Sequence, residues 1–338
     1  MNKGLLESAA RRMGEEPGGI LAADESIGTM GSRLNDIGIT DNPEDPTYRN
    51  AWRAVMFGAS LRPAVNGVIL FEEQLANPKL VNMLTVQGVL PGIKIDQGLA
   101  FFAGSDVEQV TLGLDGVEKR LKLYSEQGAA FTKFRSFIHI REGQGMPSDA
   151  CILANAKAQA GFARASQDSG RVPMVEPEVN MVGEHPIEYC AEVTEQVLRI
   201  VFEELDAAGV HLPGMVLKPN MILSGSKAKN RAAPEAVARA TVDVLSRVVP
   251  DAVPVIAFLS GGQTDEEAYA NLSAINLTAR AEGHPWRLTY SFGRAAQKGA
   301  LNVWRGSPYS VQAARARFVE LLAEMSAASM GAYPTVAV

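Results

Sequence analysis

Residues that bind metals or form disulfides are scarce in this chain of 338 residues. Its cysteines and histidines are Cys151, Cys190, His139, His185, His211 and His284. Two cysteines in helix-like stretches cannot supply a disulfide framework, so we interpret both as small core residues of a reducing compartment. A zinc site needs clustered ligands, and these histidines are scattered along the chain. The composition therefore predicts neither a bound metal nor a disulfide.

Long apolar runs and an excess of positive charge are also missing. No stretch approaches the ~20 apolar residues of a membrane span, and residues 1–8 lack the apolar run of a signal peptide. A net charge of -6 and a pI near 5.4 argue against nucleic-acid or anionic-membrane partners. With 46% hydrophobic residues and a mean hydropathy of -0.01, we expect a soluble, cytoplasmic protein.

Apolar runs of strand length alternate with longer amphipathic stretches. The runs that predict strands are residues 18–25, 65–71, 91–96, 129–135, 172–178, 214–220, 253–259 and 286–290. The stretches that predict helices are residues 112–127, 149–168, 187–206, 234–249, 265–280 and, last, 311–325. Strands and helices that alternate without a hairpin predict a parallel sheet with right-handed crossovers.

Two further features favour a closed barrel over an open sheet. No Gly-x-Gly-x-x-Gly nucleotide fingerprint follows the first predicted strand. Charged residues follow many strands rather than one switch point, as at the catalytic face of a barrel. No Pro/Gly/Ser-rich linker divides the chain. We therefore expect an α/β protein in which residues 1–338 form a single catalytic (β/α)8 TIM barrel domain with extra N-terminal and C-terminal helices.

Lys218, in Gly214-Met-Val-Leu-Lys-Pro-Asn220, is the most informative residue. Three apolar residues precede it, and Pro219 stops the strand directly after it. A lysine at the inner end of an apolar strand is costly to keep charged, which favours an amine that can attack a carbonyl. Other strand tips carry Lys94, Lys133, Arg135, Glu176, Glu178, Asp24 and Glu25. So many charges at strand tips indicate one polar centre rather than lysines that reach out to solvent.

Serine and glycine residues follow the last two predicted strands, in Ser260-Gly-Gly-Gln263 and Ser291-Phe-Gly-Arg294. Glycines after a strand let backbone N–H groups approach an oxyanion, and a following helix adds favourable potential. Arg294 adds a planar, permanently charged group that suits phosphate. Because the last two loops are the usual phosphate site of such barrels, they predict phosphate binding.

Seven motifs occur in a single order along the chain. They are Leu21-Ala-Ala-Asp-Glu-Ser26, Ile93-Lys-Ile-Asp96, Phe131-Thr-Lys-Phe-Arg135, Val175-Glu-Pro-Glu178, Leu217-Lys-Pro-Asn220, Phe258-Leu-Ser-Gly-Gly-Gln263 and Ser291-Phe-Gly-Arg294. Together they make residues 3–333 resemble class I fructose-bisphosphate aldolase. The resemblance implies an enzyme of glycolysis and gluconeogenesis that reversibly cleaves fructose 1,6-bisphosphate to dihydroxyacetone phosphate and glyceraldehyde 3-phosphate. It also implies a homotetramer that uses no metal and no cofactor.

The resemblance assigns a role to each matched residue. Lys218 would form the Schiff base, and Glu176 would move protons. Asp24 and Lys133 would assist, and Glu178 would orient the lysines. The residues implied at the C1 phosphate are Ser260, Gly261, Gly262, Ser291, Gly293 and Arg294. Those implied at or toward the C6 phosphate are Ser26, Arg33, Lys94 and Arg135.

Two features depart from the pattern of animal members. Ser32 stands where they carry a lysine beside the arginine matched by Arg33, which weakens the positive field at the C6 end. Their longer tail ends in a tyrosine that visits the site, and Tyr333 stands too early to be equated with it. Residues after Met325 leave the amphipathic pattern, so we expect residues 326–338 to be a mobile C-terminal tail.

Three alternatives belong to different classes of function. A Schiff-base aldolase that prefers another phosphorylated ketose, such as fructose 1-phosphate, would keep the same centre, and one sequence does not separate the two preferences. A metal-dependent aldolase would need clustered histidine ligands. A binding or scaffold protein would not need an intact set of ionisable residues at its strand tips.

Overall fold

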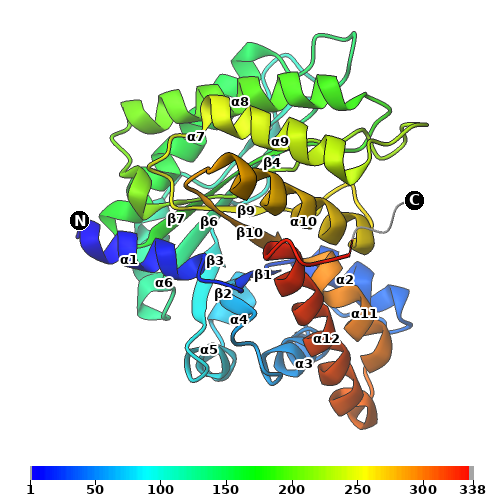
Figure 1. Cartoon of the computed structure of the whole chain (residues 1–338). Coiled ribbons are helices and arrows are strands. Elements are labelled where there is room, and N and C mark those ends of the chain that lie inside the picture. Colours follow the sequence, from blue (N-terminus) through cyan, green and yellow to red (C-terminus); the bar gives the residue numbers. More distant parts are fainter. Residues whose placement is uncertain (1, 335–338) are drawn as a thin grey trace.

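The computed structural model describes residues 2–334. In that part of the chain, eight parallel strands close into a barrel in the order β1-β10-β9-β8-β7-β6-β3-β2 (Figure 1). They are β1 (Gly19–Ala23), β2 (Val65–Leu70), β3 (Leu90–Lys94), β6 (Phe131–Ile138), β7 (Val172–Val179), β8 (Val216–Leu217), β9 (Val255–Phe258) and β10 (Arg287–Phe292). Each overlaps one predicted strand, so the predicted (β/α)8 barrel is confirmed.

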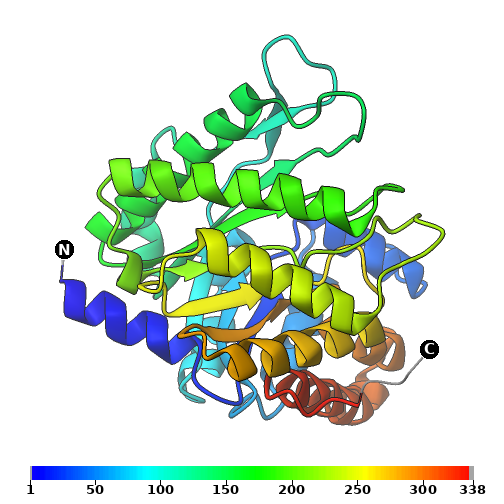
Figure 2. The ribbon, with the colours of Figure 1, turned by 45° about the horizontal axis from the view of Figure 1, so that its top comes forward.

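Helices surround the barrel (Figures 1 and 2). In chain order they are α1 (Lys3–Met13), α2 (Ile27–Asp36), α3 (Thr47–Phe57), α4 (Glu72–Leu75), α5 (Pro78–Thr85), α6 (Val117–Glu126), α7 (Asp149–Asp168), α8 (Ile187–Ala207), α9 (Pro234–Val248), α10 (Asp265–Glu282), α11 (Arg294–Trp304) and α12 (Val311–Ser329), with short 3-10 turns at η1 (Leu212–Gly214) and η2 (Pro308–Ser310). The helices predicted from 149 to 280 begin where expected.

The helix predicted at residues 112–127 is wrong at its start. α6 begins at Val117, and an antiparallel hairpin of β4 (Leu99–Phe101) and β5 (Gln109–Thr111) precedes it. Leu112 extends this hairpin, because its N–H donates to the carbonyl of Gly98 at 2.9 Å. Gly113, with a φ of 127°, then turns the chain in a conformation that L side chains rarely adopt. The apolar spacing that predicted a helix therefore belongs partly to the edge of a hairpin.

The N-terminal helix α1 closes one end of the barrel. Leu6, Ala10 and Met13 lie on one helical face and pack against inward-facing residues at the strand starts. Among these, the ring of Phe131 lies over Gly92, where a Cβ would come within 2.2 Å of the ring. The result is an apolar floor, and Figures 1 and 2 show α1 at the opposite end of the barrel from α2 and α11. Polar chemistry is left to that other end, where the strands terminate.

The final helix continues past its predicted end at Met325 to Ser329. Ser329 is buried, and Arg287 donates to its carbonyl at 2.9 Å and to its hydroxyl at 3.2 Å. Beyond the helix, the Ser273 hydroxyl donates to the carbonyl of Tyr333 at 3.1 Å. The predicted helix boundary is therefore wrong, because the buried Ala328 and the polar contacts of Ser329 both fix this last turn. The mobility of residues 326–338 stays a prediction, and residues 335–338 lie outside the described residues.

Candidate active site

Because side chains alternate between the two faces of a strand, several charged side chains near the strand ends face the inside of the barrel. Ala22, Phe131, Met174 and Val216 face inward as part of the apolar core inside the barrel. Since side chains of a strand alternate between its two faces, residues two or four positions later face inward as well. These are Asp24 after β1, Lys133 and Arg135 on β6, Glu176 and Glu178 on β7, and Lys218 after β8. The strand-tip charges predicted from the sequence therefore meet at one end of the barrel.

Four of these residues form a continuous chain of contacts. The backbone N–H of Lys218 donates to the carbonyl of Val175 at 2.8 Å, which sets Lys218 level with the tip of β7. Lys218 Nζ then lies 3.0 Å from Glu176 Oε1. The other carboxylate oxygen, Glu176 Oε2, lies 2.7 Å from Lys133 Nζ. Lys133 Nζ in turn lies 2.9 Å from Asp24 Oδ2, so positive and negative groups alternate along the chain.

The side chains of Lys218 and Glu176 are each only 4% exposed, so these charges interact away from bulk water. Burial by itself would raise the pKa of Asp24, but the ammonium groups of Lys133 and Lys218 outweigh burial and hold that pKa at about 2. The same opposition gives Glu176 a lowered pKa, because Lys133 and Lys218 again outweigh burial. Burial disfavours the charge on Lys133, yet Asp24 and Glu176 raise its pKa above the ordinary value. Lys133 is therefore a firmly held cation between two carboxylates.

Glu178 lies farther along β7 and behaves differently. Its Oε2 is 2.6 Å from Arg135 Nε. Burial nevertheless raises the pKa of Glu178, since the attraction of Arg135 is partly cancelled by the nearby carboxylate of Glu176. Glu178 thus belongs to the same electrostatic environment and contacts Arg135 rather than either lysine.

Cations at the rim of the barrel each have a carboxylate partner. Lys94, at the end of β3, forms an ion pair with Asp96, and Asp96 Oδ2 also accepts from the backbone N–H of Arg135 at 3.3 Å. Arg33 on α2 forms an ion pair with Glu25. Asp96 and Glu25 received no role from the sequence. Their position in the sequence could have pointed to them, because Asp96 and Glu25 lie in the same motifs as Lys94 and Asp24.

The loops after β9 and β10 lie beside each other because Tyr290 pairs with Phe258 in the barrel. Ser260 and Ser291 are buried. The Ser291 hydroxyl has no hydrogen-bond partner among the described residues. A buried donor without a partner is costly, so it marks a position suited to a ligand oxygen.

Glycines let these loops approach their neighbours closely. A Cβ on Gly261 would lie 3.4 Å from Glu178 Oε1, and a Cβ on Gly293 would lie 3.3 Å from the Ala22 carbonyl. Gly262 has a φ of 76°, which favours glycine. The structure therefore brings the predicted phosphate loops against the tips of β1 and β7. Ser26, the remaining predicted contact, caps α2 by accepting from the N–H of Thr29 at 3.3 Å.

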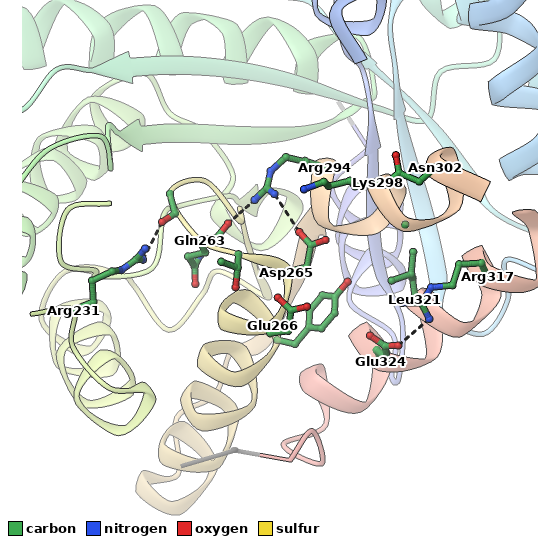
Figure 3. Close-up of a pocket in the computed structure, with 14 residues that line it drawn as sticks. Arg231, Gln263, Asp265, Glu266, Arg294, Lys298, Asn302, Arg317, Leu321 and Glu324 are labelled. Carbon is green, nitrogen blue, oxygen red and sulfur yellow. Dashed lines mark hydrogen bonds and ion pairs between the residues drawn. The ribbon is translucent and has the colours of Figure 1, made fainter. Parts of the chain in front are cut away.

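Arg294 extends to one side of these loops. It donates to the Gln263 carbonyl and lies 3.3 Å from Asp265 Oδ1 (Figure 3). Here it lines a cavity of about 660 Å³ bordered by α10, α11 and α12. The lining residues do not include Lys218 or Glu176, so this cavity lies beside the buried lysines rather than over them. In this arrangement Arg294 is an exposed neighbour of the predicted phosphate loops.

Tyr333 lies against the same group of helices. Its ring packs edge-on against Tyr269 of α10, with 5.5 Å between ring centroids. Tyr269 also lines the cavity beside Arg294. The phenol of Tyr333 is therefore held at the outer side of the barrel, and the structure gives it no contact with Lys218.

Comparisons with known proteins agree with this geometry. The family described as class-I fructose-bisphosphate aldolase matches residues 5–337. The chain belongs to this aldolase family. It is 44% identical over 335 residues to fructose-bisphosphate aldolase 6, cytosolic, of Arabidopsis thaliana. The alignment covers 97% of this chain and 91% of that protein. It is also 43% identical over 335 residues to fructose-bisphosphate aldolase C-A of Danio rerio, over 97% of this chain and 90% of the relative.

A solved structure shows the same aldolase fold. It is the fructose-bisphosphate aldolase of Plasmodium falciparum, described in a ternary complex with TRAP and a small-molecule inhibitor. The two structures superpose with a TM-score of 0.94 at 39% sequence identity, over 98% of this chain and 96% of that one. The resemblance drawn from seven motifs is therefore confirmed for the family and for the barrel.

The described residues also bear on membranes and metals. Within residues 2–334, no helix is both long enough and apolar enough to cross a bilayer. The same residues contain no group of three or more His, Cys, Asp or Glu side chains arranged to hold a metal ion. Independence from metals stays a prediction for an activity assay.

Proposed function

We propose that this chain reversibly cleaves fructose 1,6-bisphosphate to dihydroxyacetone phosphate and glyceraldehyde 3-phosphate through a Schiff base on Lys218. The observation that carries the proposal is one buried carboxylate between two amines. Glu176 lies 3.0 Å from Lys218 Nζ and 2.7 Å from Lys133 Nζ. An amine attacks a carbonyl only when it is neutral, and Glu176 stands where it can take the proton of Lys218. Lys133 keeps its own charge because Asp24 also pairs with it.

The bonds change as follows. Lys218 Nζ attacks the C2 carbonyl carbon, and the carbinolamine loses water as Glu176 returns a proton to the departing hydroxyl. The resulting iminium accepts the electron pair of the C3–C4 bond, while the C4 hydroxyl gives its proton to Glu176. The cation of Lys133, held by Asp24, stabilises negative charge on the C4 oxygen. Glyceraldehyde 3-phosphate leaves, and protonation of the enamine at C3 followed by hydrolysis releases dihydroxyacetone phosphate.

The two phosphates of the substrate bind at different parts of the rim. The groups proposed for the C1 phosphate are Ser260, Gly261, Gly262, Ser291, Gly293 and Arg294, and the unpartnered hydroxyl of Ser291 supports this assignment. The groups proposed for the C6 phosphate are Ser26, Arg33, Lys94 and Arg135. Each cation of the second set already pairs with a carboxylate, so a phosphate there competes with Glu25, Asp96 or Glu178. Glu178 orients Arg135, and no observation favours fructose 1-phosphate as the preferred substrate.

A cytoplasmic location and a homotetramer complete the proposal. The relative from Arabidopsis thaliana is named a cytosolic enzyme, and the tetramer follows from the family resemblance. Light scattering coupled to size-exclusion chromatography measures the mass directly, and a mass near four times 36.1 kDa is expected. A monomer would contradict the assembly without affecting the proposed chemistry.

Borohydride trapping with dihydroxyacetone phosphate tests the function. Reduction of the Schiff base should leave a stable adduct, and peptide mass mapping should place it on Lys218. The Lys218→Met variant should lose both the adduct and cleavage, whereas Lys157→Met, at an exposed position of α7, should keep both. An active enzyme labelled on Lys94 or Lys133 would overturn the assignment.

A further inference from the structure

The start of helix α11 packs against the end of β1. It begins at Arg294, directly after Gly293. A Cβ on Gly293 would meet the Ala22 carbonyl at 3.3 Å and Glu25 Oε1 at 3.7 Å. One turn later, Gln297 faces the same place and is only 1% exposed. The loop proposed for the C1 phosphate and a buried glutamine therefore belong to one rigid element.

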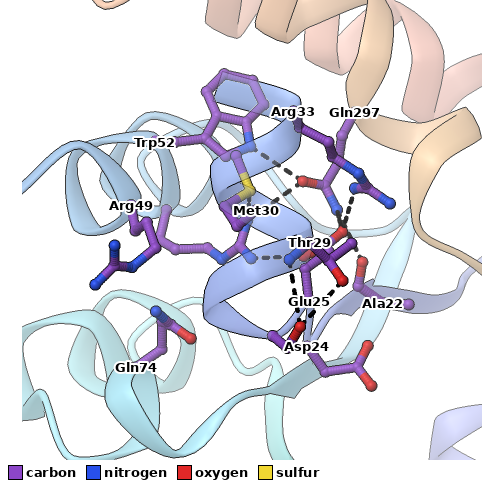
Figure 4. Close-up of polar contacts among 12 residues, drawn as sticks. Ala22, Asp24, Glu25, Thr29, Met30, Arg33, Arg49, Trp52, Gln74 and Gln297 are labelled. Carbon is purple, nitrogen blue, oxygen red and sulfur yellow. Dashed lines mark hydrogen bonds and ion pairs between the residues drawn. The ribbon is translucent and has the colours of Figure 1, made fainter. Parts of the chain in front are cut away.

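Every hydrogen-bonding position of the Gln297 amide is occupied (Figure 4). Its Nε2 donates to the Ala22 carbonyl and to Glu25 Oε1, both at 2.8 Å. Its Oε1 accepts from Trp52 Nε1 at 3.0 Å and from Arg53 Nη1 at 3.3 Å. An amide has two donor and two acceptor positions, so this arrangement admits one orientation. Gln297 thus joins α11, the tip of β1 and α3 at one point.

Glu25 is the residue that this arrangement holds. Its Oε2 accepts from Arg53 Nη2 at 2.5 Å, and Arg53 is itself 1% exposed. The carboxylate also pairs with Arg33, whose side chain is 24% exposed at the rim. Glu25 directly follows Asp24, the last member of the buried chain of charges. Gln297 and Arg53, both buried, hold this carboxylate, and the more exposed Arg33 contacts the same Oε1 as Gln297.

We propose that Gln297 is a positioning residue that sets the preference for a ketose phosphorylated at C6. It fixes Glu25, and Glu25 fixes Arg33, relative to the helix that begins at the C1-phosphate loop. The Gln297 amide then helps to set the separation between the two phosphate sites, so a bisphosphate fits without moving either end. This inference rests on the proposed function, because it takes Arg33 as a ligand of the C6 phosphate.

A second buried glutamine, Gln167, contacts only backbone groups away from the site. Gln167 is also fully buried. Its Nε2 donates to the carbonyls of His211 and Gly214 at 2.9 and 3.3 Å, and its Oε1 accepts from the His211 N–H at 2.8 Å. All these partners are backbone groups, and none belongs to the site. Gln167 therefore provides a matched control for the loss of a buried amide.

The test compares kcat/KM for fructose 1,6-bisphosphate and fructose 1-phosphate in Gln297→Met. This change keeps the side-chain length and removes all four hydrogen bonds. We expect kcat/KM for the bisphosphate to fall about tenfold more than for the monophosphate, which is the size of losing one hydrogen bond to a charged group. The loss should appear mainly as a higher KM for the bisphosphate. Equal losses on both substrates, or none, would overturn the proposal.

Three further measurements sharpen the result. Gln167→Met should lower the midpoint of chemical denaturation and leave the substrate ratio unchanged. In an Arg33→Ala background the selective effect of Gln297→Met should vanish, and its persistence would refute the path through Arg33. If Gln297→Met does not fold, Trp52→Phe removes one of the four hydrogen bonds and should shift the ratio in the same direction. Wild-type protein without a trapped adduct on Lys218 would instead refute the proposed function.

Discussion

Asp24→Asn removes one charge from the buried chain of contacts and keeps an oxygen that can accept from Lys133. In the folded protein the pKa of Asp24 is about 2, below the value of about 3.9 that a free aspartate has. A carboxyl whose pKa is lowered by folding contributes stability above its unfolded pKa, and it loses that contribution as the pH falls through the folded pKa. The difference between the two values corresponds to about 2.5 kcal/mol of unfolding free energy at neutral pH.

We therefore expect Asp24→Asn to lower the free energy of unfolding by about 2.5 kcal/mol at pH 7, and the difference from wild type to shrink as the pH falls from about 4 to about 2. Urea denaturation followed by circular dichroism at fixed pH values measures this difference. Asp168→Asn is the control, since Asp168 pairs with Arg164 on an exposed helical face and surface pairs contribute little. A loss that is equal at both ends of this pH range, or a variant more stable than wild type at pH 7, would refute the reasoning.

Three other predictions concern activity. Glu176→Gln keeps the shape of the side chain and removes the proposed proton shuttle, so turnover should fall by roughly 10²–10⁴-fold with a much smaller change in KM. A loss below tenfold in a steady-state assay would assign the proton transfers to another carboxylate. Arg294→Ala should weaken binding of ketoses with a C1 phosphate by about one to two orders of magnitude, and an equal loss for dihydroxyacetone, measured by competition, would mean that Arg294 supports the fold instead. Exhaustive chelation should leave the cleavage rate unchanged, because the iminium proposed on Lys218 would already accept the electron pair, and activity restored only by added zinc would contradict this.

The barrel could be predicted from the sequence because its strands are short apolar runs that end on charged residues. Pro219 shows why: it has no N–H to donate after that of Lys218, so the same short motif marks both the strand end and the catalytic candidate. The hairpin at β4 and β5 was missed because Leu99 and Phe101 are exposed and make no inward pattern. Gln297 and Arg53 were missed for a different reason. They are separated by 244 positions, and only the closed barrel brings them to Glu25.

The apolar floor built by α1 covers the barrel at the end where its strands begin, so we expect substrate to approach Lys218 from the other end. We expect substrate to enter and both products to leave at that same end of the barrel. The order of release then depends on which fragment remains bonded to the protein. In the proposed reaction the ketone half is still bonded to Lys218 after cleavage, so the aldehyde departs first. Water for the hydrolysis that completes the proposed reaction then enters from the end of the barrel opposite α1.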